Sequence, residues 1–391
     1  MKKFDFLFVS EGLIISDDSG GSTTLMKLAS ELSRRHYAVG ICMVKDVYRQ
    51  IANILGNRDI LKIRNKSFKF RLLSFVPFFG KHSYNFFLKV LGRFGVITLL
   101  HRYDTKKIDI LFFNGKKWPE FECKFLISNS WETAYLVNQY NRDILEKFQI
   151  LQYGDNKDFA LDYVGENFKY LSNTFNFDLS FICINKYDFI KYSEKRPILI
   201  KDGIRSGEFY RAKNIAKIPN MILIPLRKHL EKGAEIALEC INVLVQRRSD
   251  IKIITFGNYA GRIPSGVSHM GFVSRDKLFT LYNQATIFIF PSIAEGFGLT
   301  GLEAMACGCV TVASDNVGVR EYLEPGVNGI IVPTRDPKAL ASSVLFLLDN
   351  PDQISTMSQK AIETAQEFNE VNMCDSFLNA VNARFNDFKS K

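Results

Sequence analysis

The chain has 391 residues, of which 47% are hydrophobic, and it carries a formal net charge of +10. This length favours two domains, and the hydrophobic content is ample for two buried cores. The seven cysteines include no CxxC pair, so a reducing, cytoplasmic compartment is the simplest inference, and no apolar run reaches the roughly 18 residues of a membrane span.

The positive charge is concentrated in one region. Residues 62–107 contain eleven Lys or Arg but one acidic residue, Asp104, so the rest of the chain is close to neutral and a general affinity for nucleic acid is not favoured. The same residues include ten aromatic side chains, a composition that suits an interfacial region on an anionic membrane surface. Ordinary helices with Phe in the core and Lys in solvent explain the composition equally well.

The first half of the chain begins with the pattern of a Rossmann-like domain. Residues 4–10 form a short apolar run, which fits a first buried strand better than a signal peptide because Asp5 interrupts it. A glycine turn is expected at residues 16–24, and residues 25–35 repeat apolar side chains at a helical period. Further strands are expected at residues 39–44, 108–114 and 124–130.

A second series of alternating strands and helices begins at residue 221. Helices are expected at residues 234–245 and 278–284, and again from Pro337 to the end. Such alternation predicts a parallel sheet that is covered on both faces. The strands of this series are expected at residues 221–226, 251–257, 286–292 and 310–314.

Together these patterns predict an α/β chain of two Rossmann-like, doubly wound domains that face each other across a cleft. The polar stretch at residues 200–220, with its glycines and Pro219, marks the boundary. The first domain is expected over residues 1–203 and the second over residues 204–370. A C-terminal helix at residues 371–391 is expected to pack back on the first domain.

The segment PSIAEGFGLTGLEAMACG, residues 291–308, places Glu295 and Glu303 eight positions apart around three glycines. It follows a predicted strand, and ligands of parallel sheets bind at the carboxyl ends of strands. Glycine lets backbone N–H groups approach a ligand, a helix that begins near Leu299 favours negative charge, and carboxylates accept hydrogen bonds from sugar hydroxyls. A phosphate or polyhydroxyl site is one interpretation, and a strand-to-helix turn with solvated acids is the other.

Arg227 and Lys232 follow the predicted strand at residues 221–226. At the start of a helix, both could reach one anion, such as a diphosphate leaving group. Two exposed basic side chains would explain this pair alone, but both clusters lie at carboxyl ends of strands in one domain. The pair Gly20 and Gly21 faces the cleft from the other domain in this scheme, although such a pair is usually only a tight turn.

The segment EGFGLTGLEAMACG resembles the signature of family 4 retaining glycosyltransferases of the GT-B fold, whose acid pair also has seven residues between its members. PLRKHLEKG is similar to their GRLxxxKG segment, and SGGSTTLMKLASELSRRHYAV to their first-domain glycine loop and helix. DGIRSGEF resembles their NGID…F linker, and NVGVREYLEPGVNGIIVP their GGxxE…G segment. The resemblance is specific over residues 198–340, looser over residues 1–60 and faint over residues 61–190. Within the faint part, LISNSWETAYLV and LQYGDNKDFALDYV are similar to members that transfer rhamnose to bacterial surface glycans.

This resemblance implies roles for individual residues. Glu303 would hold the ribose hydroxyls of a nucleotide sugar, and Glu295 would contact the transferred sugar. Arg227 and Lys232 would stabilise the departing diphosphate. Sugar hydroxyls or phosphate would be bound by the backbone amides of Phe297, Gly298 and Leu299.

The resemblance also implies roles outside these two clusters. Gly20 and Gly21 would close on the diphosphate from the first domain, and Val273 would lie near the base. The leaving phosphate oxygen would deprotonate the acceptor hydroxyl on the same face, so no protein base is needed. Neither a cofactor nor a metal is expected, and the five histidines show no metal-ligand spacing.

The chain departs from the family pattern at three places. Members usually carry a first-domain histidine near the outer hydroxyl of the donor sugar, and residues 128–135, SNSWETAY, have none. One hypothesis is that the donor lacks a 6-hydroxyl, as rhamnose does; the alternative is that Ser130 or Trp131 takes the place of the histidine. Asp202 replaces the usual Asn and Cys309 the usual Pro, and neither change is expected to abolish function.

The predicted function is a retaining hexosyl- or deoxyhexosyltransferase that moves a sugar from a nucleotide-diphosphate sugar to a glycan or lipid-linked acceptor, in polysaccharide or glycoconjugate assembly. The expected location is the cytoplasm, with residues 62–107 docking on the inner face of the plasma membrane as an option. A phosphorylase would need a pyridoxal lysine and a longer chain, and epimerases rarely combine this acid pair with the Arg and Lys. A catalytically silent subunit that binds a glycan or a partner transferase is the alternative.

Overall fold

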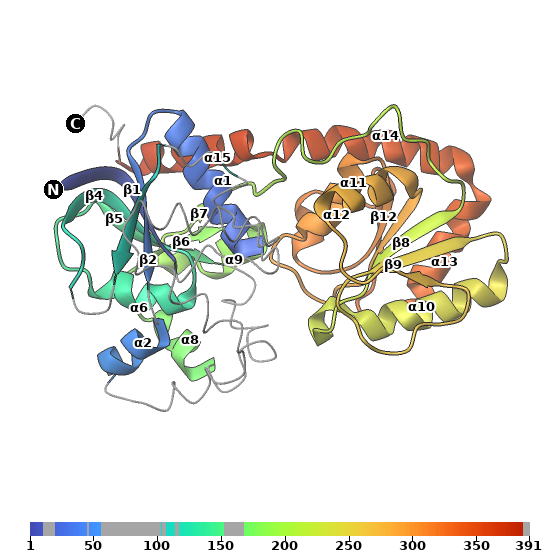
Figure 1. Cartoon of the computed structure of the whole chain (residues 1–391), viewed down its shortest axis with the longest axis horizontal. Helices are drawn as coiled ribbons and strands as arrows, with labels where there is room; N and C mark the ends of the chain where they lie inside the picture. Colours follow the sequence, from blue (N-terminus) through green and yellow to red (C-terminus); the bar gives the residue numbers. More distant parts are fainter. Residues whose placement is uncertain are drawn as a thin grey trace. The chain divides into compact units, whose positions relative to one another are not determined.

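The structure, a computed structural model, describes residues 1–10, 20–44, 47–55, 103, 107–113, 117–151 and 168–385. The chain forms two compact α/β units, Met1–Ile200 with Cys374–Lys391 and Lys201–Met373 (Figure 1). Apart from Tyr103 and Lys107, the basic segment at residues 62–107 lies outside the described residues. In the described part of the chain, no helix is both long and apolar enough to cross a membrane.

The first unit is built on a seven-stranded parallel sheet in the order β3-β2-β1-β4-β5-β6-β7. Strand β1, which lies between β2 and β4, has Phe8 opposite Ile41 on one side and Ile127 on the other, and its apolar run is buried on both faces, as expected for a parallel sheet. The strands are β1 (Lys2–Ser10), β2 (Val39–Val44), β3 (Asp109–Phe113), β4 (Phe121–Ser128), β5 (Glu146–Leu151), β6 (Ser180–Cys183) and β7 (Ile198–Leu199).

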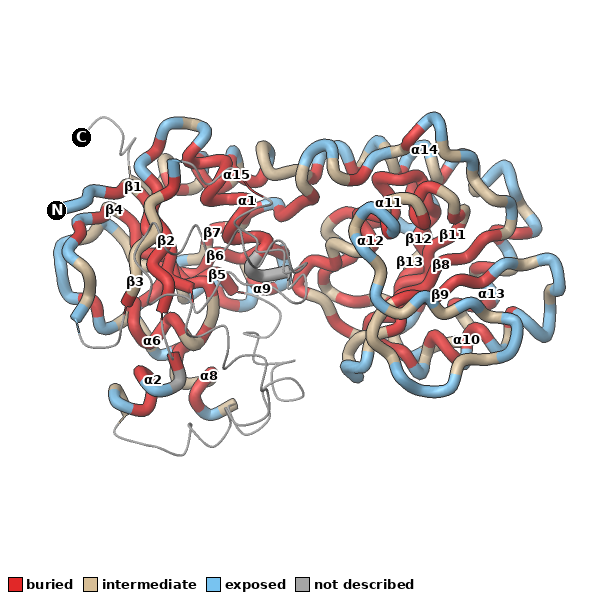
Figure 2. Tube along the Cα trace, viewed as in Figure 1, coloured by how far each residue is buried: buried red, intermediate tan, exposed pale blue. Residues whose placement is uncertain are grey.

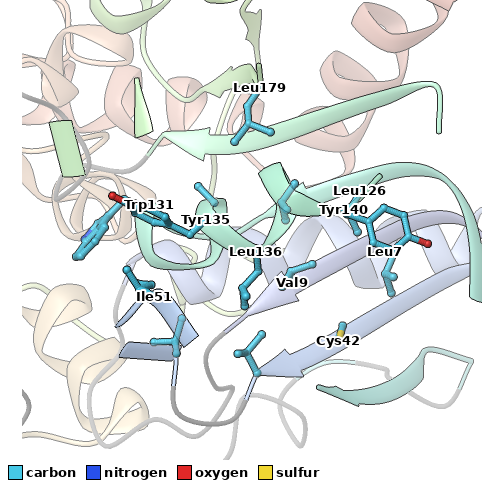
Figure 3. Close-up of a cluster of buried hydrophobic side chains, with 14 of the residues drawn as sticks. Leu7, Val9, Cys42, Ile51, Leu126, Trp131, Tyr135, Leu136, Tyr140 and Leu179 are labelled. Carbon is cyan, nitrogen blue, oxygen red and sulfur yellow. The ribbon is translucent and has the colours of Figure 1, made fainter. Parts of the chain in front are cut away.

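Helices pack on this sheet and close its core. Leu7, Val9 and Leu126 of the sheet lie in one apolar cluster with Tyr135 and Leu136 (Figure 3). The helices are α1 (Gly20–Arg34), α2 (Val47–Leu55), α6 (Trp131–Gln139), α8 (Phe168–Thr174), α9 (Lys186–Lys191), the short 3₁₀-helix η5 (Ser193–Lys195) and the later part of α15 (Glu370–Phe385). In this later part of α15, the Phe377 ring centroid lies 5.4 Å from that of Phe6 and the Phe385 centroid 5.3 Å from that of Phe125.

The structure corrects the glycine turn that the sequence predicted at residues 16–24. Helix α1 already begins at Gly20, so Gly20 and Gly21 are its first two residues and not part of a loop. The first N–H groups of a helix have no acceptor within it, so the low helix propensity of glycine weighs less there than in a helix interior. The helix is also anchored further along, where Leu25 and Leu28 are buried. Residues 11–19 lie outside the described residues.

The second unit is built on a six-stranded parallel sheet in the order β10-β9-β8-β11-β12-β13. The chain builds outward from β8 through β9 to β10, then crosses back to β11 and builds outward on the other side. The point where the order reverses therefore lies between β8 and β11, and ligands of doubly wound sheets bind at such a point. The strands are β8 (Met221–Pro225), β9 (Lys252–Phe256), β10 (Ser268–His269), β11 (Ile287–Phe290), β12 (Val310–Ser314) and β13 (Gly329–Val332).

Helices cover this sheet, and its strands are buried along most of their length (Figure 2). Ile222 and Ile224 of β8 share a core with Ile241 of α10 and Val344 of α13, so these two helices cover one face. Helix α12 packs with α14. The helices are α10 (Ala234–Arg247), α11 (Arg275–Gln284), α12 (Leu299–Ala306), α13 (Pro337–Asp349) and α14 (Pro351–Glu367), with the 3₁₀-helices η6 (Leu230–Lys232) and η7 (Gly318–Glu321).

Candidate active site

Two loops leave the second sheet side by side at its switch point. Strands β8 and β11 are paired neighbours, with Ile222 opposite Ile287. The loop after β8 carries Arg227 and Lys232, and the loop after β11 carries Glu295. The strand order therefore brings together the basic pair and the first acid, which are far apart in the sequence.

The three charged side chains line one hollow. Lys232 Nζ lies 3.0 Å from Glu295 Oε2, and the two side chains are 18% and 15% exposed. Glu295 is therefore a largely buried, paired acid and not the solvated acid of the alternative interpretation. The hollow is lined by Pro225, Arg227, Lys232, Phe290, Ser292, Glu295 and Thr300.

Gly233 allows the loop after β8 to pack closely against the loop after β11. Its φ of 67° lies in the left-handed region, and a Cβ at this position would come 2.1 Å from the carbonyl oxygen of Pro291, so only glycine fits. The amide of Ile293 donates a hydrogen bond of 2.8 Å to the carbonyl of Glu231 across the same gap. Lys232, the last residue of η6, is thereby held beside the loop after β11, which carries Glu295. Arg227 lies in the loop after β8 and not in a helix.

The loop after β11, which carries Glu295 and its glycines, ends at the N-terminus of α12. Gly298, with φ of 84°, is the residue before the helix, and Phe297 is buried. The first N–H groups of a helix have no acceptor within it and carry partial positive charge, which suits an anionic group. The backbone of Phe297, Gly298 and Leu299 therefore has the form that the sequence analysis assigned to it, although its binding role stays a prediction.

Glu303 lies further along α12 and faces different partners. Its side chain is 11% exposed, and its Oε1 accepts a hydrogen bond of 2.9 Å from Arg275 Nη2. The single proton of the Tyr282 hydroxyl is shared between Oε2 of Glu303 at 3.5 Å and the carbonyl of Thr300 at 3.3 Å. The structure thus brings Arg227, Lys232 and Glu295 into one hollow, whereas Glu303 lies outside its lining, on the same helix as Thr300.

Two buried tyrosines stand next to these acids. Burial raises the pKa of Tyr322 well above its ordinary value of 10, and the nearby carboxylates of Glu295 and Glu303 raise it further. Burial, followed by the charge of Glu303, likewise raises the pKa of Tyr282. Both phenols therefore stay protonated at neutral pH and act as hydrogen-bond donors.

Arg275 is the candidate that the sequence analysis missed. The sequence predicts a helix only over residues 278–284, so Arg275 lies outside any predicted element. The structure starts α11 at Arg275, with the Ser274 hydroxyl accepting the amide of Lys277 at 3.3 Å. A serine before an apolar-periodic segment is a helix-start signal that could have identified this boundary. Val273 is partly exposed in the loop between β10 and α11, and its contact with a base stays a prediction.

In the first unit, Ser130 and Trp131 follow β4 at the point where that sheet reverses its order, between β1 and β4. Trp131 is buried in the core and makes an edge contact with Tyr135 (Figure 3). The roles expected of Gly20 and Gly21 toward a diphosphate stay predictions. Among the described residues, no three His, Cys, Asp or Glu side chains are grouped so that they could hold a metal ion.

Comparisons of the sequence with known proteins find a family match within the second unit. Residues 221–350 match the family model described as glycosyl transferases group 1. A D-inositol 3-phosphate glycosyltransferase from Thermobispora bispora is 38% identical over 87 residues, which are 22% of this chain and 20% of that protein, so the match spans only a fifth of this relative. An N,N'-diacetylbacillosaminyl-diphospho-undecaprenol alpha-1,3-N-acetylgalactosaminyltransferase from Campylobacter jejuni is 23% identical over 370 residues, 90% of this chain and 93% of that protein.

The comparison of structures concerns the fold. The crystal structure of Anabaena HepE in complex with UDP and glucose matches with a TM-score of 0.63 at 13% identity, over 98% of this chain and 100% of that chain. At this identity the likeness shows a shared fold, and the two parallel α/β sheets agree with it. The chain therefore has the GT-B fold, and residues 221–350 are similar to the glycosyl transferases group 1 family.

Proposed function

We propose that the chain is a retaining glycosyltransferase that moves a sugar from a nucleotide-diphosphate sugar to a hydroxyl of a glycan or lipid-linked acceptor. The observation that carries this proposal is the hollow at the β8–β11 switch point, where Arg227 and Lys232 meet Glu295. Two cations match the charge of a diphosphate, and a carboxylate beside them accepts hydrogen bonds from sugar hydroxyls. The group 1 domain match over residues 221–350 supports the same activity.

In the proposed complex, the diphosphate lies against Arg227, Lys232 and the N-terminus of α12. Glu295 orients the sugar while it keeps Lys232 in place through their 3.0 Å ion pair. Glu303 holds the ribose. The Anabaena HepE structure, which is a complex with UDP and glucose, supports a donor of this class.

The proposed reaction needs charge stabilisation more than a protein base. The bond between the sugar carbon and the diphosphate oxygen breaks, and the acceptor oxygen bonds to that carbon from the same face. The acceptor proton passes to the leaving phosphate oxygen. Arg227 and Lys232 stabilise the negative charge that develops on the leaving group. We assign this role to the two side chains and not to a metal ion, so EDTA should leave turnover unchanged.

The test is nucleotide release by the full chain from UDP-, GDP- and dTDP-sugars, with NMR of the product to show whether the anomeric configuration is kept. We expect Arg227→Met and Lys232→Met to lower the rate by about a hundredfold, as losses of a charge-stabilising group do. Arg248→Met is the matched control, because Arg248 pairs with Asp250 and Asp349 on the surface. Wild-type rates in both Arg227 and Lys232 variants would refute the proposal. Nucleotide binding without release would favour the catalytically silent subunit.

A finer proposal concerns the donor sugar. We propose that it lacks a 6-hydroxyl, as rhamnose does, because residues 128–135, at the end of β4 and directly after it, include no histidine. Burial of Trp131 in the core supports this proposal, since a core side chain is poorly placed to replace the histidine. The same donor panel checks it, since pairs of 6-deoxy and 6-hydroxy donors are compared directly. A preference for the hydroxylated member would reject it.

The acceptor side is also a proposal. The Campylobacter relative is named for a diphospho-undecaprenol substrate, which is a lipid-linked acceptor. The basic, aromatic composition of residues 62–107 supports docking of this chain at an anionic membrane surface where such an acceptor is presented. Flotation with anionic vesicles at moderate salt is the measurement, and a chain that stays in the unbound fraction would argue against docking.

A further inference from the structure

Arg275 joins two carboxylates of the second unit and covers an aromatic ring. Its Nη2 lies 2.9 Å from Glu303 Oε1, and its Nε donates to Glu208 Oε1. Its guanidinium carbon lies 4.6 Å from the ring centroid of Phe209. The guanidinium is therefore held at once by α12 and by the segment that precedes the second sheet.

An arginine suits this position better than a lysine would. The planar guanidinium presents separate donors to the two carboxylates while its face rests on the ring of Phe209. Glu303 needs such a partner because its side chain is 11% exposed, and a buried carboxylate without a partner is costly. A carboxylate has about four acceptor sites, so Glu303 can accept a hydrogen bond from a ligand hydroxyl without releasing Arg275.

We propose that Arg275 is a positioning residue, which fixes the Glu303 carboxylate so that it accepts hydrogen bonds from the ribose hydroxyls of the donor. The inference rests on the proposed function and deepens it, because it names the group that orients the ribose acceptor. Without Arg275, Glu303 loses its fixed orientation. The contacts to the ribose are then lost, while those to the diphosphate remain.

The test compares nucleotides that differ only in the ribose hydroxyls. Binding of UDP and of 2′,3′-dideoxyuridine diphosphate to the full chain is measured by isothermal titration calorimetry, with GDP and its dideoxy analogue as a second pair. The wild-type chain should bind the ribonucleotide at least about tenfold more tightly than its dideoxy analogue. In Arg275→Met this ratio should fall to near one through weaker binding of the ribonucleotide alone. Arg275→Lys keeps a charge beside Glu303 and should keep part of the ratio, and it serves as the test if the Met variant does not fold.

Arg248→Met is again the matched control. The Arg248 side chain is 25% exposed and that of Arg275 is 26% exposed, and each guanidinium pairs with two carboxylates. The control should keep the wild-type ratio. If the Arg275 variants weaken both members of a pair equally, Arg275 only supports the fold, and the inference is overturned. An equal affinity of the wild-type chain for both members overturns it as well, whereas a wild-type chain that binds none of UDP, GDP and dTDP refutes the proposed function itself.

Discussion

At the scale of single residues, the contacts of Tyr322 give a second reason for the glycines that follow Glu295. Its buried hydroxyl donates a hydrogen bond of 2.7 Å to the carbonyl of Gly298. A Cβ at Gly301 would come 2.6 Å from that hydroxyl oxygen, and one at Gly298 would come 3.1 Å from it. The sequence analysis attributed these glycines to close approach of a ligand. They are also needed because a larger residue at either position would collide with the Tyr322 hydroxyl.

We expect Tyr322→Phe to weaken both the fold and the site. The substitution removes this donor, and because the Gly298 carbonyl still accepts the Gly301 amide at 3.0 Å, we expect the free energy of unfolding to fall by about 1 kcal/mol. The start of α12 should also shift, which raises the KM for the nucleotide sugar. Urea unfolding and donor kinetics measure the two effects. Tyr210→Phe is the control, since Tyr210 is 52% exposed, and equal behaviour of the two variants would contradict the expectation.

At this scale the sequence supplied the candidates but not their partners. Glu295 and Glu303 belong to one motif, yet Glu295 pairs with Lys232 and Glu303 with Arg275. The partner of Glu295 was already a candidate, because it followed a recognisable strand. Arg275 was not, because nothing in its local sequence distinguishes it from an exposed arginine at the start of a helix.

At the scale of elements, the Lys217 side chain joins the ends of two helices. Its Nζ donates to the carbonyls of Tyr282 at 3.1 Å and Ala285 at 2.6 Å, at the end of α11, and to that of Cys307 at 3.0 Å, just after α12. The last carbonyls of a helix have no donor within it and carry partial negative charge. Burial lowers the pKa of Lys217, and the three acceptors compensate by holding its ammonium group.

Replacement of this lysine by methionine should separate the helix ends. Lys217→Met leaves three carbonyls without their charged donor, and we expect the free energy of unfolding to fall by about 3 kcal/mol. Urea unfolding of the full chain, followed by circular dichroism, gives the value. Lys213→Met, at an exposed position four residues earlier, should change it by less than about 0.5 kcal/mol. A Lys217 variant as stable as the Lys213 variant would mean that water replaces the ammonium without loss.

Elements were predictable where burial leaves a clear pattern. The apolar runs that became β1, β2, β8 and β12 were recognised, because a parallel strand buried on both faces is almost continuously apolar. The sequence analysis did not assign β5, β6, β7, β10 or β13, and all of these except β5 have four residues or fewer. Segments this short have no period to detect, and neighbouring strands decide whether they pair.

At the scale of the whole molecule, both units bury all seven cysteines as free thiols. Burial raises the pKa of Cys42 and Cys123 in the first unit to about 12, and that of Cys240 in the second unit to about 12, from an ordinary value of 9.0. At a pH between these two pKa values, the thiols are ionised in the unfolded chain and protonated in the folded chain. The contribution of these thiols to stability is therefore complete below pH 9 and is lost as the pH rises toward 12.

We therefore expect the free energy of unfolding to fall with pH above 9, by up to about 1.4 kcal/mol per pH unit for each buried thiol. Urea unfolding under reducing conditions at pH 8, 9, 10 and 10.5 measures the slope. Cys240→Ala should reduce the slope in the transition that reports the second unit, whatever its effect on stability at pH 8. A free energy that does not change over this range would show that the thiols ionise as easily in the folded chain as in the unfolded one.

The sequence by itself determined the alternation of strands and helices and the charged residues of the acid and basic segments, because burial and turn chemistry act on neighbouring residues. The GT-B fold class followed from the resemblance of those segments to a known family. Only the tertiary structure decided that Lys232 meets Glu295 and that Arg275 meets Glu303. Those two ion pairs form because β11 pairs with β8 and because α11 lies near α12. Such long-range contacts produce no periodic pattern in the sequence.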